Sequence, residues 1–413
     1  MSFEPLDLLW LLLPLAAASG WLAARREFLH KHERGNRLPQ GYFRGVNYLL
    51  NEQPDKAIEM FTRMLEINTE TVETHLALGS LFRRRGEVER AIRIHQNLMA
   101  RPTLTQEYRT LALSELAHDY HKAGLLDRAE GLFLELCETR EHSEQAMRTL
   151  MQIYEQEKDW EKAITIGRRL AHRAGHPTQT LLAQYHCEMA AQQIHAGNLN
   201  TAGNTLELAL QLDSHCVRAR LLSGHLLVSR GALRDAIRVW QAIEQQEPEF
   251  MEEAVEGLSE AYQRLGDHQG LEKYLTALLQ RHPAPRTLLT LADTLIRRGA
   301  LMEARLLVRG HLLHYPFTGG LKWLVEHSAL EGEPSASPND EVASHVLEQL
   351  SLTQQAYQCE RCGYRGNTLH WQCPACHEWV TTRPAVRAAP ERDALIEFKK
   401  KPKQKNKSLR PQS

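Results

Sequence analysis

The residues of this chain best suited to chemistry are four cysteines near its C-terminal end. They form two pairs, Cys359 with Cys362 and Cys373 with Cys376, and ten residues separate the pairs. Two residues between paired cysteines allow both thiolates to face one ion, and two such knuckles together make a tetrahedral site with four sulfur ligands. The spacing therefore predicts a site that holds one metal ion.

The segment around these cysteines, Tyr357 to Thr382, is too short to bury a large core. We therefore expect it to need its metal in order to fold. Gly363 after the first knuckle and Pro374 inside the second suit tight turns around the thiolates. Four thiolates fit zinc and iron equally well in geometry, so the residues alone leave the metal open.

No arrangement typical of an enzyme active site occurs in the sequence. It lacks the His-Glu-x-x-His pattern, a phosphate-binding glycine loop followed by Lys and Ser or Thr, and the Gly-x-Ser-x-Gly turn. His95, His186 and His225 each lie alone in a helical pattern, where a histidine is more often packed or solvated than a ligand. We therefore expect a protein that is not an enzyme.

The elements that must position the cysteines follow from a repeat in the long segment before them. A small residue is followed twelve residues later by another, usually Ala, and this recurs about every 34 residues. The pairs are Gly45/Ala57, Gly79/Ala91, Ala117/Ala129, Met151/Ala163, Ala190/Ala202, Gly224/Ala236, Ser259/Leu271 and Ala292/Ala304. Six copies have a glycine seven residues after the first small position, and Pro248, Pro283 and Pro316 close later copies.

Each feature of the repeat has a physical cause. Small residues let the two helices of a hairpin approach closely, and the glycine ends the first helix in a left-handed cap. Proline cannot continue a helix, so it ends the second one. This is the tetratricopeptide-repeat pattern, and it predicts an all-α stack of helix hairpins whose long face holds segments of other proteins.

The N-terminal end predicts a membrane anchor. Pro5 to Ala24 is apolar except for Asp7 and Pro14, and twenty helical residues rise about 30 Å, enough to cross the hydrocarbon of a bilayer. The basic residues follow this stretch instead of preceding it, which argues against a cleaved signal peptide. By the positive-inside rule the N-terminus is periplasmic and the bulk of the chain cytoplasmic.

The remaining segments are linkers and a tail. Cys137, Cys187 and Cys216 sit singly in helical patterns, as small buried residues do, which agrees with a reducing compartment. The last residues are rich in lysine, which favours a solvated extension; contact with anionic lipid is the alternative. The predicted organisation is an anchor at 1–24, a basic linker at 25–37, eight repeats at 38–318, capping helices and a linker at 319–356, the metal module at 357–382 and the basic tail at 383–413.

The combination of these parts resembles the lipopolysaccharide assembly protein B family of Gram-negative bacteria. The motifs that carry the resemblance are Cys-Glu-Arg-Cys-Gly-Tyr at 359–364, Leu-His-Trp-Gln-Cys-Pro at 369–374, and the run Ala-Leu-Gly-Ser-Leu-Phe-Arg at 77–83. The resemblance covers about Leu6 to Ala389, so the lysine-rich end is extra. It implies a rubredoxin-like module, with Cys359, Cys362, Cys373 and Cys376 as ligands of iron. Zinc is the alternative, because the gap between the knuckles is short for a rubredoxin and His377 replaces the usual glycine.

The resemblance also implies a function and partners. It implies a single-pass inner-membrane adaptor that presents the UDP-acyl-N-acetylglucosamine deacetylase committing precursors to lipid A to an FtsH-type membrane AAA+ protease. A further inner-membrane protein is expected to oppose it, and the repeats are expected to scaffold lipopolysaccharide assembly proteins. Two alternatives from other classes remain open at this point. One is a redox-active iron protein, and the other is a zinc ribbon that binds nucleic acid, with Tyr364, Trp371 and Trp379 as stacking surfaces.

Overall fold

The structure is a computed structural model, and it describes Trp21 and residues 40–51, 53–67, 72–139, 142–174, 178–328 and 356–385. The predicted anchor, apart from Trp21, lies outside these residues, as do the basic linker at 25–37, residues 329–355 of the predicted capping helices and linker, and the chain beyond Ala385. Among the helices that the structure describes, none is both long and apolar enough to span a membrane.

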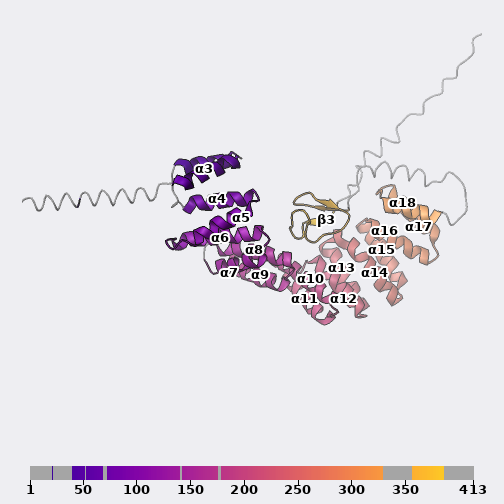
Figure 1. The fold of residues 1–413 in the computed structure, drawn as a ribbon. Coiled ribbons are helices and arrows are strands. Elements are labelled where there is room, and N and C mark those ends of the chain that lie inside the picture. Colours follow the sequence, from indigo (N-terminus) through magenta and orange to yellow (C-terminus); the bar gives the residue numbers. More distant parts are fainter. Residues whose placement is uncertain are drawn as a thin grey trace, which may run out of the picture. The chain divides into compact units, whose positions relative to one another are not determined.

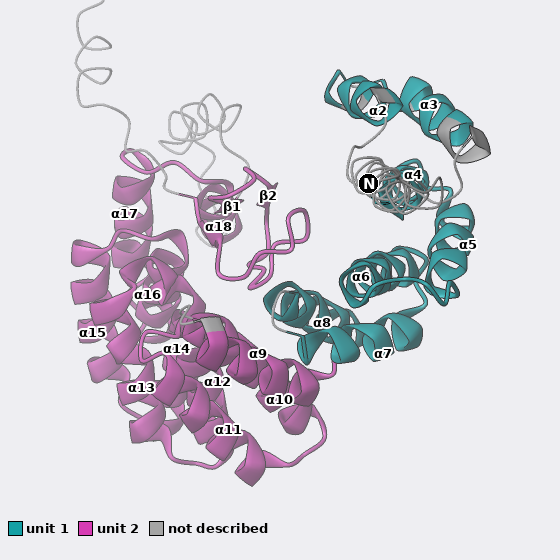
Figure 2. Ribbon diagram, turned by 90° about the vertical axis from the view of Figure 1, so that its left-hand side faces the viewer, with its two compact units in different colours: residues 1–157 teal, residues 158–413 magenta. Residues whose placement is uncertain are grey.

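The chain divides into two compact units, residues 1–157 and 158–413 (Figure 2). The helices described in the first unit are α2 (Gln40–Leu50), α3 (Pro54–Ile67), α4 (Val72–Arg84), α5 (Val88–Met99), α6 (Gln106–Lys122), α7 (Leu126–Cys137) and α8 (Ser143–Glu157). In this unit α2 packs on α3, α4 on α5 and α6 on α7, which are the hairpins that the repeat spacing predicts.

The second unit contains the later repeats and the cysteines (Figure 1). Its helices are α9 (Trp160–Ala174), α10 (Gln179–His195), α11 (Leu199–Leu212), α12 (Val217–Ser229), α13 (Leu233–Gln246), the 3-10 turn η1 (Pro248–Phe250), α14 (Met251–Leu265), α15 (His268–Arg281), α16 (Pro285–Arg297), α17 (Leu301–Leu312) and α18 (Thr318–Ser328). Three short strands follow: β1 (Tyr357–Cys359), β2 (Arg365–Gly366) and β3 (Thr382–Pro384).

The small positions of the repeat allow bulky side chains to cross between helices. A Cβ added to Gly224 of α12 would lie 2.1 Å from the indole of Trp240, and one added to Gly257 of α14 would lie 2.5 Å from the same ring. Trp240 is fully buried between these two helices, and its indole N–H donates to the Leu221 carbonyl at 3.3 Å. Gly224, a small position of the repeat, and Gly257, two residues before the next such position, therefore let one large aromatic join neighbouring repeats.

The predicted helix ends are confirmed where glycine was expected to form them. All six glycines have left-handed backbones: Gly86, Gly124, Gly197, Gly231, Gly266 and Gly299. Lys158 takes the same conformation, with φ 57°, at the equivalent place after α8. The turn geometry therefore persists where the glycine is missing, although a side chain makes that backbone less favourable.

A buried ion-pair network joins α4 to α6. Arg83, in the last turn of α4, forms ion pairs at 2.7 Å with Glu115 and with the fully buried Asp119 of α6. A buried carboxylate needs such a partner because water cannot solvate it. Asp119 also contacts Nδ1 of the buried His95 at 2.5 Å, so His95 is a packed residue of the repeats, as expected.

Two cysteines and two glycines show how closely the later helices pack. Cys187 and Cys216 are buried and free, as expected of small core residues, and their Sγ atoms lie 3.8 Å apart. The first helix of the predicted capping segment, α18, begins at Thr318 and includes Gly319 and Gly320. Gly320 fits there because a Cβ would lie only 2.8 Å from Leu312 and Phe317.

Candidate metal centre

A three-stranded antiparallel sheet positions the four cysteines. The strand order is β2-β1-β3, with Tyr357 opposite both Gly366 and Pro384. The first knuckle forms the turn between β1 and β2, and the second lies inside a smaller loop closed by a bridge between Gln372 and Trp379. Each cysteine pair therefore lies in a turn held at its base by paired backbone.

The two knuckles share one backbone geometry. The Gly363 N–H donates to the Cys359 carbonyl at 3.0 Å, and the His377 N–H donates to the Cys373 carbonyl at 2.9 Å. Both donors have left-handed backbones, φ 75° for Gly363 and φ 57° for His377. His377 thus occupies the place where the first knuckle has a glycine, and its side chain is exposed.

The sulfur atoms lie at distances that suit one tetrahedral ion. All four Sγ atoms are within 4.8 Å of one another, with 3.8 Å between Cys359 and Cys376 and 3.7 Å between Cys362 and Cys373. Metal–sulfur bonds of about 2.3 Å give a tetrahedron with edges of about 3.8 Å. The four cysteines that the sequence predicted are therefore brought together as a metal-binding site, which zinc and iron fit equally well.

The electrostatics of the sulfurs favour a bound cation. Burial raises the pKa of the Cys359 thiol, but its hydrogen bond with the Thr381 hydroxyl and those from the backbone N–H groups of Cys362 and Arg361 lower it to about 6. The Tyr364 N–H lowers the pKa of Cys362, yet burial and the neighbouring sulfurs raise it to about 12. Four such close thiolates repel one another, and a metal cation removes that penalty.

Comparisons with known proteins agree with this geometry. A family model described as "Rubredoxin metal binding domain" matches residues 357–384, and one described as "Tetratricopeptide repeat" matches residues 74–107. A solved structure of the C-terminal part of a TPR repeat-containing protein from Cytophaga hutchinsonii is 11% identical, its match covers 60% of this chain and 99% of that chain, and the TM-score is 0.40.

Two relatives match this chain over almost their whole length. Lipopolysaccharide assembly protein B of Escherichia coli (strain K12) is 35% identical, and the match covers 92% of this chain and 98% of the relative. Lipopolysaccharide assembly protein B of Haemophilus influenzae is 33% identical, with the same coverage. This chain belongs to the lipopolysaccharide assembly protein B family.

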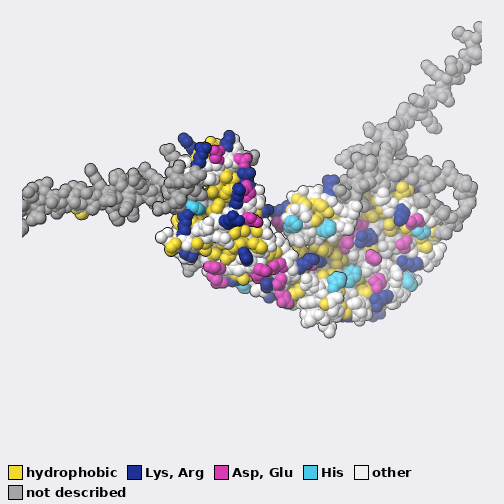
Figure 3. Space-filling view, in the orientation of Figure 1, with side chains coloured by type: hydrophobic (Ala, Val, Ile, Leu, Met, Phe, Trp, Pro, Cys, Tyr) yellow, Lys and Arg dark blue, Asp and Glu magenta, His cyan; other side chains and the backbone are white. Residues whose placement is uncertain are grey.

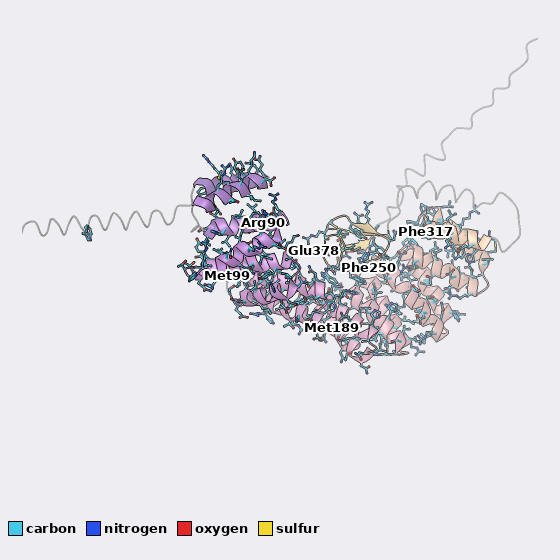
Figure 4. The ribbon with its side chains drawn as sticks, viewed as in Figure 1. Arg90, Met99, Met189, Phe250, Phe317 and Glu378 are labelled. Atoms are coloured by element: carbon cyan, nitrogen blue, oxygen red, sulfur yellow. The ribbon has the colours of Figure 1, made fainter. Side chains whose placement is uncertain are left out.

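In this member of the family, the metal module packs against the repeats of its own unit. Trp371, two residues before the second knuckle, stacks on Phe250 of η1 with ring centroids 5.8 Å apart. Figure 4 labels Phe250 of the repeats and Glu378 of the module. Arg383 of β3 donates to Glu247 at 2.9 Å and to Glu249 at 2.6 Å, and its guanidinium lies 5.6 Å from the Phe250 ring centre. η1 is therefore the main docking point of the module.

Two further contacts fix the module at either side of η1. The Tyr357 hydroxyl donates to Glu253 of α14. Burial raises the pKa of Tyr357, and this hydrogen bond raises it further. Trp379, three residues after the second knuckle, makes edge contacts with Trp160 of α9 at 6.2 Å and with Tyr185 of α10 at 5.8 Å. In this lipopolysaccharide assembly protein B family member, the metal module thus contacts helices that lie far apart in the sequence.

Sequence reasoning identified the four cysteines but missed the residues that hold the module. Trp371 and Trp379, which only the nucleic-acid alternative used as stacking surfaces for bases, pack against protein aromatics of the repeats. No local pattern predicts that Arg383 meets residues more than 130 positions earlier. One local signal for this docking point exists in the sequence. Pro248-Glu249-Phe250 interrupts the helical pattern and places an acidic residue and an aromatic residue at a helix junction.

Proposed function

We propose that this chain is a non-enzymatic adaptor of lipopolysaccharide synthesis and assembly. The observation that carries the proposal is the match to curated lipopolysaccharide assembly proteins over 98% of their length, which includes both the repeats and the metal module. Tetratricopeptide repeats generally hold segments of other proteins on an extended surface. The visible face of the second unit carries both acidic and basic side chains (Figure 3).

We further propose specific protein partners for this adaptor and a location in the inner membrane. The adaptor presents the UDP-acyl-N-acetylglucosamine deacetylase of the lipid A pathway to an FtsH-type AAA+ protease, and a further inner-membrane protein opposes it. The apolar stretch Pro5–Ala24 anchors the chain in the inner membrane, with the N-terminus periplasmic and the repeats cytoplasmic. Degradation of the deacetylase then limits lipopolysaccharide synthesis.

The metal is proposed to act in folding. When bound, it cross-links the two knuckles, and the folded module then presents Trp371 and Trp379 to the repeats. Cys359, Cys362, Cys373 and Cys376 would hold it, and iron is the ion that the family resemblance implies. Metal analysis of the chain purified from cells grown with both metals separates iron from zinc, and reversible bleaching by a reductant would favour the redox alternative.

The decisive experiment measures the half-life of the deacetylase after protein synthesis is stopped, with and without depletion of this chain. A markedly longer half-life on depletion supports the adaptor function. The same measurement in cells that lack the protease is the control, because depletion should then have no further effect. An unchanged half-life in protease-containing cells would rule the adaptor function out.

A further inference from the structure

A cleft of about 430 Å³ lies on the seam between the metal module and the repeats. The repeat side contributes Met251, Leu278, Pro283 and Tyr315, and the module side contributes Tyr357 and Pro384. This volume is in the range of clefts that hold a small ligand or a few side chains. An occupant of the cleft would touch both the module and the repeats.

The wall of the cleft contains a polar atom without a partner. Thr287 is 1% exposed and lines the cleft, and its hydroxyl has no hydrogen-bond partner among the described residues. A buried hydroxyl normally has a partner, because leaving it unpaired costs about 1–3 kcal/mol. This hydroxyl is itself closed to solvent, so a peptide segment in the cleft would pair with it only after a small shift of the wall.

The described chain ends at this cleft. Pro384 and Ala385 form part of its wall, and Ala385 is held there by a hydrogen bond of 2.8 Å from its N–H to the Ala356 carbonyl. Residues 386–413 follow directly. A tethered segment of this kind has an effective concentration in the millimolar range, so even a weak contact is populated.

The following segment has a composition that matches the cleft. Its one cluster of large apolar residues is Leu395, Ile396 and Phe398, and Lys399, Lys400 and Lys401 come next. Nine residues between Ala385 and Leu395 span at most about 30 Å when extended, which is ample for a loop back to a cleft that Ala385 itself borders. The apolar cluster suits the Met251, Leu278 and Tyr315 side of the cleft.

The charges at the cleft also suit a basic segment. Arg281 lines the cleft but forms a 2.7 Å ion pair with Glu244, so its charge is already compensated. Glu252 lines the cleft, and its carboxylate makes no ion pair among the described residues. The carboxylate accepts the Arg286 backbone N–H at 2.9 Å, and the Glu252 carbonyl accepts from the Arg286 guanidinium at 3.2 Å. A lysine that follows the apolar cluster can therefore pair with Glu252.

We propose that Leu395–Phe398 of this chain binds in the cleft and places the lysines at 399–401 beside Glu252. The segment then acts as a strap that holds the metal module on the repeats. This inference does not depend on the proposed role in lipopolysaccharide synthesis. It concerns a binding surface of this chain for its own C-terminal segment.

The test uses the full chain with a photoreactive benzophenone amino acid in place of Phe398. Irradiation followed by peptide mass spectrometry should show cross-links to Met251, Tyr315 or residues 281–287. The same probe in place of Leu409, beyond the lysines, is the control and should give a yield about tenfold lower at these residues, which corresponds to about 1.4 kcal/mol of contact. A mixture of isotope-labelled and unlabelled chains separates cross-links within one chain from those between copies.

Two variants strengthen the test. Ala284→Arg introduces a long side chain at the cleft and should lower the Phe398 cross-link yield about tenfold. Ala232→Arg is the matched control, because Ala232 is also a half-buried helix N-cap but does not line the cleft. If Ala284→Arg fails to fold, Leu395→Asp with Ile396→Asp changes only the tail and should abolish the same cross-links.

Each other outcome overturns the proposal. Cross-links between differently labelled copies would make the occupant a second copy, and cross-links to detergent or added anionic lipid would make the tail a membrane contact. Equal yields at positions 398 and 409, or no effect of the paired Asp substitutions, would show that the apolar cluster does not bind in the cleft.

Discussion

At the scale of single residues, His377 is the most informative position of the metal centre. It has the left-handed backbone that Gly363 has in the first knuckle, although a side chain disfavours this conformation. We expect His377→Gly to stabilise the metal-bound module by about 1 kcal/mol. Slower metal loss to a chelator, measured by optical absorbance or by mass spectrometry, would report this gain.

The mirror substitution controls for the loss of the imidazole. Gly363→His gives the first knuckle the residue of the second and should destabilise the module by about 1 kcal/mol, because it places a side chain at φ 75°. Faster metal loss is then expected. If His377→Gly instead accelerated metal loss, the imidazole would be contributing to the site and the strain argument would be wrong.

At the scale of helices, the small positions of the repeat determine how closely neighbours pack. Gly224→Ala should destabilise the second unit by about 1–3 kcal/mol, because its Cβ would lie 2.1 Å from Trp240 in a core without room. The midpoint of thermal unfolding is the measurement. Gly310→Ala is the matched control, since nothing lies within 4 Å of its added Cβ and alanine favours a helix.

The contact between the module and η1 gives a second prediction at this scale. Arg383→Ala removes the pairs with Glu247 and Glu249 and should weaken docking by about 1 kcal/mol, a modest value because these groups are partly exposed. Hydrogen exchange at the backbone amides of residues 249–251 should then become about fivefold faster. Arg361→Ala is the control, because Arg361 pairs with Glu378 inside the module. Unchanged exchange in the Arg383 variant would mean that the aromatic contacts suffice.

These elements also show what the sequence predicts and what it does not. The helix pairs, their left-handed ends and the four cysteines depend on spacing within about forty residues, and local physics decides them. The pairing of Arg83 with Asp119, and of Cys187 with Cys216, depends on how one repeat lies on the next. The contact of Trp379 with Trp160 joins residues more than 200 positions apart, where no periodicity reaches.

At the scale of the whole molecule, the metal links a small module to the repeats of its unit. Residues from β1, the second knuckle and β3 each contact a different part of the repeats, through Tyr357, Trp371, Trp379 and Arg383. These side chains can meet their partners together only if the module is folded. Because so small a module buries little core, loss of the metal should release all of these contacts at once.

The last prediction separates the metal centre from the repeats. Cys359→Ser together with Cys362→Ser should abolish metal binding and unfold the module, while far-ultraviolet circular dichroism stays nearly unchanged because the helices do not depend on the ion. Tryptophan emission should shift to the red as Trp371 and Trp379 leave their aromatic partners. Cys137→Ala, a cysteine outside the module, is the control and should keep the metal. If the adaptor proposal holds, the serine variant should also fail to shorten the half-life of the deacetylase. Normal regulation by a metal-free chain would show that the repeats act without the module, and the docking contacts would then serve stability alone.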